Sequence, residues 1–271
     1  MQKVKITCIS ENTSSFLKSR FLASHGQSLL LEIDDEKYLF DTSAIYEGFM
    51  YNLESMGLKL EDIQTIVLSH NHLDHSGALF KLVDQFINQQ LLLPPDMQQI
   101  NEEGYNPAYR TGNKEVAIQK LLDYKNTSII TNGKQITENL YTTGALDAPD
   151  KEQSLVIAVP NKGLVILVGC SHPTIPVIVT QAKEVTGIEK IYGIIGGLHY
   201  ARLEKAELLK NIQYLKSLDL DFIVPSHCTG YTATILMREI LGEKVHYSSV
   251  GGQFGSGNSV TILPELSFDL S

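Results

Sequence analysis

The first third of the chain alternates short apolar runs with polar turns, a pattern that predicts closely spaced β-strands. The last of these runs is almost continuously apolar and ends before Ser69 and His70, which is typical of a buried strand. Helical spacing of apolar residues also predicts two helices, with Ser43 as the cap of the first. The strands are expected at 4–9, 28–33, 37–40 and 63–68, and the helices at about 43–56 and 77–90.

The second half of the chain predicts a hairpin followed by alternating helices and strands. The hairpin joins 154–159 to 164–168 through the turn Pro160-Asn-Lys-Gly163. Early hairpins followed by βαβα units indicate an α/β fold in which a mixed sheet packs between helices. Helices are expected at 173–185, 204–218 and 231–241, and strands at 191–195, 222–225 and 245–247.

Residues 91–139 have the least regular pattern in the chain. Prolines and glycines break the segment into loops, and only 116–124 has a helical pattern. No proline-, serine- or glycine-rich linker divides the chain, so we expect a single domain over residues 1–271. Within that domain, 91–139 is interpreted as an insertion that shapes access to a site, the alternative being a peripheral loop without a role.

Composition narrows the class of protein without indicating an activity. The 271 residues are 43% hydrophobic and carry a formal charge of −9, which argues against nucleic acid as a partner. The apolar runs are too short to cross a membrane, and the first residues lack the apolar core of a signal peptide. Three cysteines without a CxxC pair indicate a reducing compartment, so a cytoplasmic location is expected.

Histidines mark the ends of four predicted strands. The hexapeptide His70-Asn-His-Leu-Asp-His75 follows the strand at 63–68, and three later strands are followed by His172, His199 and His227. Residues just beyond the carboxyl ends of strands converge on one crevice of an α/β sheet, so these side chains are expected to lie together. Imidazole and carboxylate groups together suit zinc, iron or manganese.

The spacing within the hexapeptide predicts a paired metal site. His70 and His72 alternate as in an extended chain, so both can face one ion. Asp74 and His75 follow a turn and can face a second ion. Two ions about 3.5–4 Å apart clamp an oxyanion between them. We therefore expect two divalent ions, with zinc favoured and iron or manganese as alternatives.

The hexapeptide resembles the HxHxDH motif of the metallo-β-lactamase superfamily. Asp41, after an early strand, resembles the buried aspartate that precedes the metal loop in that family. The resemblance spans roughly residues 4–250, and it is closest to the dihydropterin-ribofuranosylaminobenzene phosphate synthases and their bacterial metallo-hydrolase relatives. Five short strings indicate this subgroup within the superfamily. They are Glu11-Asn-Thr13, Ser24-His-Gly26, Gly169-Cys-Ser-His172, Gly196-Gly-Leu-His199 and His227-Cys-Thr-Gly230.

The resemblance implies a four-layer αββα sandwich with the metals at one edge of its two sheets. It also assigns the ligands of both ions by position in the motif. By this correspondence, the first ion is bound by His70 and His72, and the second by Asp74, His75 and His227.

Two ligands that are usual in the family have no counterpart in this chain. The segment 141–147 lacks the expected histidine, and Gly169-Cys170 stands where a bridging aspartate usually follows a glycine. We expect His172 to supply the missing ligand, with the Cys170 thiolate as the less favoured alternative.

Two predicted helix starts indicate an anionic substrate. Pro173 is expected in the first turn of a helix beside His172, and Thr229 is expected to cap a helix beside His227. Unpaired N–H groups at such starts attract phosphate, although the same features also occur as plain caps. The expected substrate contacts are Cys170, His199, Cys228, Thr229 and Gly230.

These observations lead to the hypothesis of a metal-dependent hydrolase or transferase. The substrate is expected to be a phosphorylated or pyrophosphorylated small molecule, and the resemblance suggests a dihydropterin. Asp74 and His199 are the expected catalytic residues, although His199 is also interpretable as a metal ligand or a substrate contact. The alternative is a non-catalytic metal or ligand sensor on the same fold, which the two missing ligands favour. The sequence indicates no oligomeric state.

Overall fold

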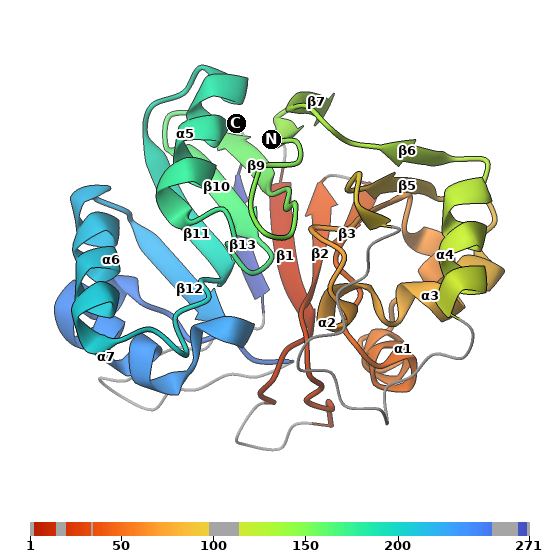
Figure 1. Cartoon of the computed structure of the whole chain (residues 1–271), viewed down its shortest axis with the longest axis horizontal. Helices are drawn as coiled ribbons and strands as arrows, with labels where there is room; N and C mark the ends of the chain where they lie inside the picture. The colour runs from red at the N-terminus through yellow and green to blue at the C-terminus, as the bar shows by residue number, and fades with distance from the viewer. Residues whose placement is uncertain (1–2, 15–19, 34, 98–113, 251–264, 270–271) are drawn as a thin grey trace.

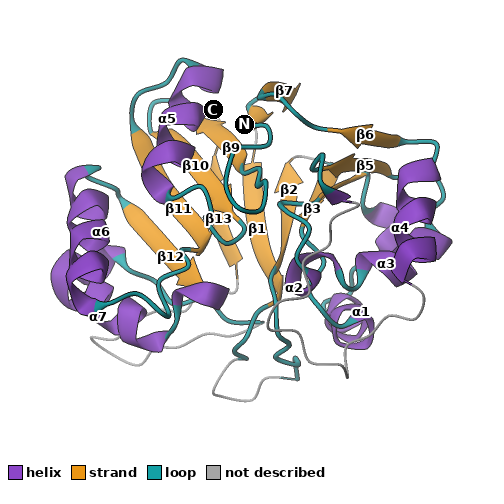
Figure 2. Ribbon diagram, in the orientation of Figure 1, coloured by secondary structure: helices purple, strands orange, loops and turns teal. Residues whose placement is uncertain are grey.

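Two β-sheets lie face to face in the middle of the molecule, and helices cover the outer face of each (Figures 1 and 2). The structure is a computed structural model that describes residues 3–14, 20–33, 35–97, 114–250 and 265–269. The first sheet contains the predicted early strands and is closed at one edge by a strand from the end of the chain. In spatial order its strands are β13 (Glu265–Asp269), β1 (Lys3–Ser10), β2 (Ser28–Ile33), β3 (Glu36–Phe40), β4 (Thr65–Val67), β5 (Gln90–Leu93) and β6 (Thr127–Ile129).

The second sheet combines the predicted hairpin with parallel strands. In spatial order its strands are β12 (Phe222–Ser226), β11 (Ile191–Gly197), β10 (Gly163–Val168), β9 (Leu155–Val159), β8 (Leu140–Thr142) and β7 (Lys134–Thr137). β9 and β10 are antiparallel, whereas β10, β11 and β12 are parallel neighbours. The carboxyl ends of these three strands therefore meet at one edge of the sheet.

Helices form the two outer layers, which confirms the expected four-layer αββα arrangement. None of the described helices is long and apolar enough to cross a membrane. The helices beside the first sheet are α1 (Tyr46–Ser55), α2 (Leu73–Ser76), α3 (Leu79–Leu82) and α4 (Lys114–Asp123), and those on the second sheet are α5 (Ile175–Thr186), α6 (Lys205–Ser217) and α7 (Tyr231–Leu241).

Three buried apolar clusters hold the four layers together. The central cluster lies between the sheets and includes Leu31 from β2 and Leu167 from β10, both fully buried. The other two lie between each sheet and its helices. Because the central strands are covered on both faces, they are apolar at nearly every position, which explains the continuous runs in the sequence.

The helix expected over 77–90 is shorter than the sequence pattern predicts. α3 ends at Leu82 and is followed by a 3-10 turn, Val83–Gln85. The backbone N–H groups of Ile87 and Asn88 donate hydrogen bonds to the side chain of Gln89, which turns the chain away from the helix. The next apolar residues then form β5, which pairs parallel with β4.

Two other boundary predictions are wrong. Val245 forms only an isolated bridge to Ile223, because the chain leaves the sheet directly afterwards, so 245–247 is not a strand. Ser43 does not cap α1, whose N-cap residue is Ile45. The hydroxyl of Ser43 instead donates to the backbone oxygen of His25.

The segment 91–139 contributes regular elements to both sheets. It supplies most of β5 together with α4, β6 and β7, so much of it belongs to the layers of the sandwich. Residues 98–113 lie outside the described part of the chain. A role of this segment in substrate access stays a prediction.

Candidate metal centre

Four loops that follow strands meet at one edge of the sandwich. The loop after β4 carries the hexapeptide, and the loops after β10, β11 and β12 carry the later histidines. All four border one cavity of about 780 Å³. The structure therefore brings together side chains from strand ends that are up to 157 positions apart, counted from His70 to His227 (227 − 70).

The first donor set consists of His70, His72 and His172, whose ligand atoms lie within 4.8 Å of one another. The His70 ring centroid lies 4.6 Å from that of His72 and 4.7 Å from that of His172. His70 Nε2 is buried and has no hydrogen-bond partner among the described residues. Burial and the neighbouring imidazoles, that of His75 foremost, hold the pKa of His70 well below its usual range. The ring is therefore neutral and suited to bind an ion.

Buried oxygen atoms determine which ring nitrogen of His70 and His75 faces the cavity. Nδ1 of His70 lies 2.8 Å from the hydroxyl of Ser69, which donates to Asp41 at 2.8 Å. Nδ1 of His75 lies 2.7 Å from the same Asp41 carboxylate. Burial raises the pKa of Asp41, and the contact with the His75 ring opposes that shift. Because both Nδ1 atoms are engaged, Nε2 of each ring is presented to the centre.

Glu152 performs the same task for His172. Its carboxylate accepts hydrogen bonds from the backbone N–H groups of Cys170, Ser171 and His172 at 2.8–3.0 Å. The carboxylate also lies 2.9 Å from Nδ1 of His172. Burial disfavours the charged form, but these contacts lower the pKa of Glu152 nonetheless. The charged residue therefore orients both the loop after β10 and the His172 ring.

The second donor set consists of His25, Asp74 and His227, again within 4.8 Å of one another. Asp74 Oδ2 lies 3.0 Å from Nε2 of His227 and 3.4 Å from Nε2 of His25. Nδ1 of His227 lies 3.0 Å from the Asn12 side-chain oxygen, which fixes the ring. Burial alone would lower the pKa of His227, but the contact with Asp74 raises it to about 9.

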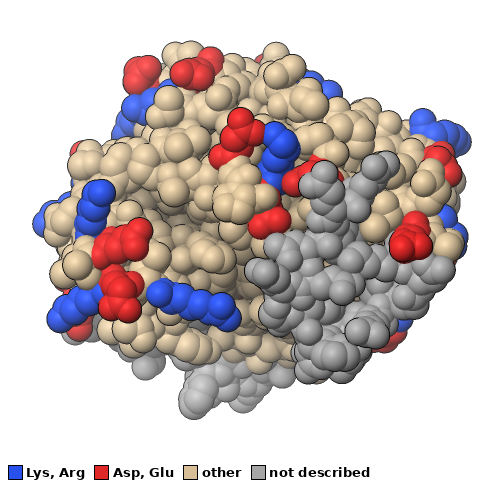
Figure 3. All heavy atoms as spheres, in the orientation of Figure 1, with Lys and Arg blue, Asp and Glu red and all other residues tan. Residues whose placement is uncertain are grey.

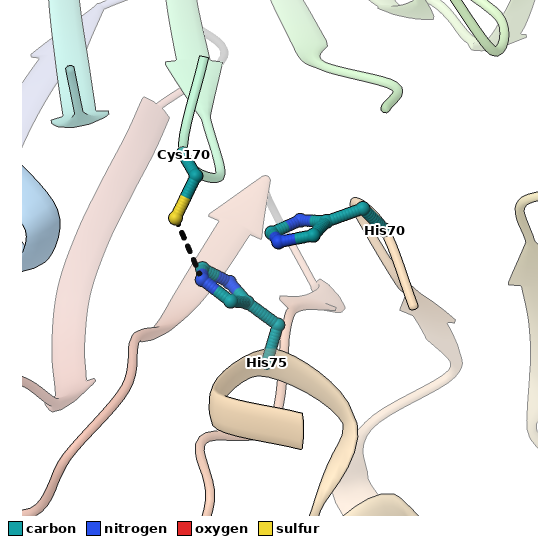
Figure 4. Close-up of side chains that lie close together, drawn as sticks. All are labelled: His70, His75 and Cys170. Carbon is teal, nitrogen blue, oxygen red and sulfur yellow. Dashed lines mark hydrogen bonds between the residues drawn. The ribbon is translucent and has the colours of Figure 1, made fainter. Parts of the chain in front are cut away.

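Cys170 lies between the two sets. Its sulfur is 3.2 Å from Nε2 of His75, and Figure 4 shows both pointing toward the space beside His70. The ligand atoms of His70, His75 and Cys170 lie within 4.8 Å of one another. The structure thus places His75 beside His70 and Cys170, with its ring 4.9 Å from that of His227. Burial raises the pKa of Cys170 in the absence of an ion.

His199 and Cys228 complete the rim of the centre. The His199 ring lies 4.9 Å from that of His172, and its backbone N–H donates to the Cys228 sulfur at 3.2 Å. Burial opposes ionisation of Cys228, but the contacts with Cys170 and His199 lower its pKa. His199 and His227 have positive φ angles of 58° and 48°, an uncommon conformation for residues other than glycine.

The expected helix starts differ from the structure. Pro173 lies outside α5, which begins at Ile175. Thr229 does not cap α7, whose N-cap residue is Gly230 with a φ of 77°. The Thr229 hydroxyl is buried and accepts a hydrogen bond from the backbone of Leu198, which explains why it is turned away from the helix start.

The cavity is lined by polar groups of both charges. Asp150 lies 3.0 Å from Nε2 of His72, and Arg202 and Tyr231 line the wall formed by the loops around α6 and α7. On the face drawn in Figure 3, the described lysines and arginines stand singly or beside acidic side chains rather than in one block. Among the described residues, the positive charge on the cavity wall is therefore that of the single side chain Arg202 and not of a basic patch.

Sequence reasoning missed three residues of the centre. Glu152 has no motif around it, and its partners are 18 to 20 positions away. His25 and Asn12 lie in short strings that the family resemblance singled out, but neither string indicated contact with Asp74 or His227. Only the tertiary structure shows these contacts.

The sandwich and its histidine-rich edge define a class of protein. The chain belongs to the metallo-β-lactamase superfamily, because the family model described as "Metallo-beta-lactamase superfamily" matches residues 23–227.

Individual relatives refine this placement. The chain is 28% identical over 273 aligned residues to the "7,8-dihydropterin-6-methyl-4-(beta-D-ribofuranosyl)-aminobenzene-5'-phosphate synthase" of Methanocaldococcus jannaschii, covering 88% of this chain and 92% of that protein. It is also 26% identical to the uncharacterized protein MJ0448 of the same organism, over 82% of this chain and 90% of that one.

Solved structures share the fold. The metal-dependent hydrolase Tm1679 of the β-lactamase superfamily superposes with a TM-score of 0.70 at 20% identity, covering 99% of both chains. The metallo-β-lactamase fold protein YhfI from Bacillus subtilis gives a TM-score of 0.60 at 15% identity, covering 92% of this chain and 98% of that one.

Proposed function

We propose that this protein is a metal-dependent hydrolase or transferase that acts on a phosphorylated or pyrophosphorylated small molecule. The observation that carries the proposal is the buried, unpartnered Nε2 of His70 within a set of converging imidazoles. A buried polar atom without a partner is unfavourable, and a divalent ion is the ligand that such a set suits. The relative from Methanocaldococcus jannaschii supports a dihydropterin as the class of substrate.

Two divalent ions fit the donor atoms, with zinc favoured and iron or manganese as alternatives. In this proposal the first ion is bound by His70, His72 and His172. The second is bound by Asp74 and His227, which lie 3.0 Å apart, and by His75, which the family resemblance assigns to it. Bound ions of this kind polarise phosphate oxygens and stabilise a leaving phosphate or pyrophosphate. Cys170 lies between the two sets and is the additional donor where the family usually has a carboxylate.

The remaining residues of the cavity bind the anion and move a proton. Arg202 and the N–H groups at the start of α7, beyond Gly230, supply positive potential on one wall. His199 is exposed on the cavity beside His172, so a ring nitrogen of His199 is placed to donate a proton to the leaving oxygen. Cys228 contributes by holding the His199 backbone.

The test is a release assay on protein loaded with zinc, manganese or iron(II). Phosphate and pyrophosphate release would be measured from simple phosphate monoesters and from a dihydropterin pyrophosphate, with and without a ribofuranosylaminobenzene phosphate acceptor. Release without the acceptor supports a hydrolase, whereas release that depends on the acceptor supports a transferase.

Variants separate catalysis from binding. The double variant His72→Ala with Asp74→Ala should abolish release, and His199→Ala should reduce the rate about 10²- to 10⁴-fold while leaving metal content unchanged. Half-buried His246 lies outside the donor sets, so His246→Ala is the control. Activity that survives the double variant in metal-stripped protein contradicts the proposal, and intact metal binding without turnover supports a sensor.

A further inference from the structure

His25 is held at the second donor set by its backbone. Its carbonyl oxygen accepts hydrogen bonds from the backbone of Ala44 and the hydroxyl of Ser43. The next residue, Gly26, has a φ of 112°, and a Cβ there would lie 1.9 Å from the backbone oxygen of Asp74. The loop that carries His25 therefore packs directly against the residue whose carboxylate the ring approaches.

Asn12 connects the same loop to His227. Its side-chain oxygen accepts a hydrogen bond from the backbone N–H of Gly26 at 3.1 Å and lies 3.0 Å from Nδ1 of His227. One oxygen thus fixes the position of the His25 loop and leaves Nε2 of His227 directed at Asp74. The two imidazoles are placed relative to each other, with ring centroids 5.5 Å apart.

The three donor atoms lie close enough together to share one ion. Ligands about 2.1 Å from a tetrahedral zinc ion stand roughly 3.4 Å from one another. Nε2 of His25 lies 3.4 Å from Asp74 Oδ2, and Nε2 of His227 lies 3.0 Å from the same oxygen. The His25 side chain is 49% exposed and borders the cavity, so this ion would face the substrate space.

We propose that His25 is a direct ligand of the second metal ion, together with Asp74 and His227. This inference rests on the metal-binding part of the proposed function and is independent of the substrate. It adds a ligand from the loop before β2 to an ion that is otherwise bound by the hexapeptide and the loop after β12.

The test is titration of chelator-stripped protein with Zn²⁺ and Co²⁺, comparing wild type, His25→Ala and the control His246→Ala. The His25 side chain is half exposed, so His25→Ala is expected to keep the fold, and circular dichroism checks this. The expected result is a second equivalent bound about 100-fold more weakly in His25→Ala, with the first equivalent and the control unchanged.

A second measurement separates a ligand from a residue that only positions Asp74. In the Co²⁺-loaded protein, each coordinated imidazole gives paramagnetically shifted proton signals, and those of one ring should disappear in His25→Ala. If His25→Ala binds both equivalents with wild-type affinity, or loses affinity without losing a shifted ring, the inference is overturned while the proposed function stands. If the wild type binds fewer than two equivalents, the paired site itself fails.

Discussion

Three histidines of the centre each have one ring nitrogen close to an oxygen that lies behind the ring. Ser69 contacts His70, Asp41 contacts His75, and Asn12 contacts His227. Such contacts fix the tautomer and the direction of each ring before an ion arrives. At the scale of single residues, we therefore expect metal affinity to depend on side chains that do not themselves bind the ion.

Replacing Asp41 with asparagine should test this dependence. Asp41→Asn keeps the volume of the side chain but removes the charge shared by Ser69 and His75. We expect metal affinity to fall about 10- to 100-fold, measured by competition with a chromophoric chelator. Asp219→Asn, at a carboxylate that is 94% exposed, is the matched control and should bind as the wild type does. Equal affinity of both variants would contradict the argument.

Glu152 should make the metal-free protein sensitive to acid. Its folded pKa lies below the ordinary value of 4.5, so the folded state binds fewer protons than the unfolded state near that pH. The stability that Glu152 contributes is therefore present above about pH 4.5 and is lost as the pH falls through the folded pKa. Urea unfolding of wild type and Glu152→Gln between neutral and acid pH measures it. The variant should be less stable at neutral pH, and its free energy of unfolding should fall less steeply as the pH is lowered. Parallel pH profiles of the two proteins would exclude this role of Glu152.

At the scale of elements, glycines at the strand ends bring the loops of the centre close together. Gly196 near the end of β11 has a φ of 131°, and a Cβ there would lie 2.0 Å from the backbone oxygen of Val168. Gly187, after α5, has a φ of 71° with no described atom within 4 Å of such a Cβ. Both positions have a positive φ that residues other than glycine rarely adopt, but they differ in the space available to a side chain.

This difference in space predicts that replacing glycine with alanine destabilises the protein more at position 196 than at position 187. Gly187→Ala should lower the free energy of unfolding by about 1 kcal/mol, because only the backbone conformation opposes it. Gly196→Ala should cost about 3 kcal/mol or more, because the added methyl group also displaces the backbone of β10. Denaturant unfolding of the two variants measures both values. Similar costs would show that the close approach of β10 and β11 is not what requires glycine.

The elements were largely predictable from the sequence, whereas the contacts behind the site were not. Apolar runs determine β9 to β12, and the residues that follow the parallel strands β10, β11 and β12 must lie at one edge whatever the loops do. The predicted length of the helix over 77–90 was wrong. The side chain of Gln89 accepts a backbone hydrogen bond from Ile87 and so favours a turn, which helical spacing does not reveal. Glu152 and His25 act only through partners far along the chain, so no local pattern could assign them.

At the scale of the whole molecule, the centre joins the two halves of the sandwich. The first donor set takes His70 and His72 from the loop after β4 and His172 from the loop after β10, in the other sheet. An ion bound there ties the sheets together in the folded state only. Binding of this kind stabilises by about 2.7 kcal/mol when the free ion is at 100 times its dissociation constant.

Removing the metal should therefore lower the thermal stability of the whole domain. Metal-stripped protein is expected to unfold several degrees below the loaded form, and added Zn²⁺ should restore the midpoint in a concentration-dependent way. Differential scanning calorimetry measures the shift. His172→Ala should show a smaller response to Zn²⁺, and an unchanged midpoint in the wild type would mean that the ion does not link the halves.

The division of the first donor set between the two halves also has a consequence for protein synthesis. A ribosome completes the hexapeptide well before His172 has been added. During that interval His70 and His72 lack their third ligand, so the growing chain should hold an ion only weakly. We expect tight loading only after the second sheet has docked, so a chain that stops early should stay without metal. Capture of the ion would thereby depend on the completion of both translation and folding.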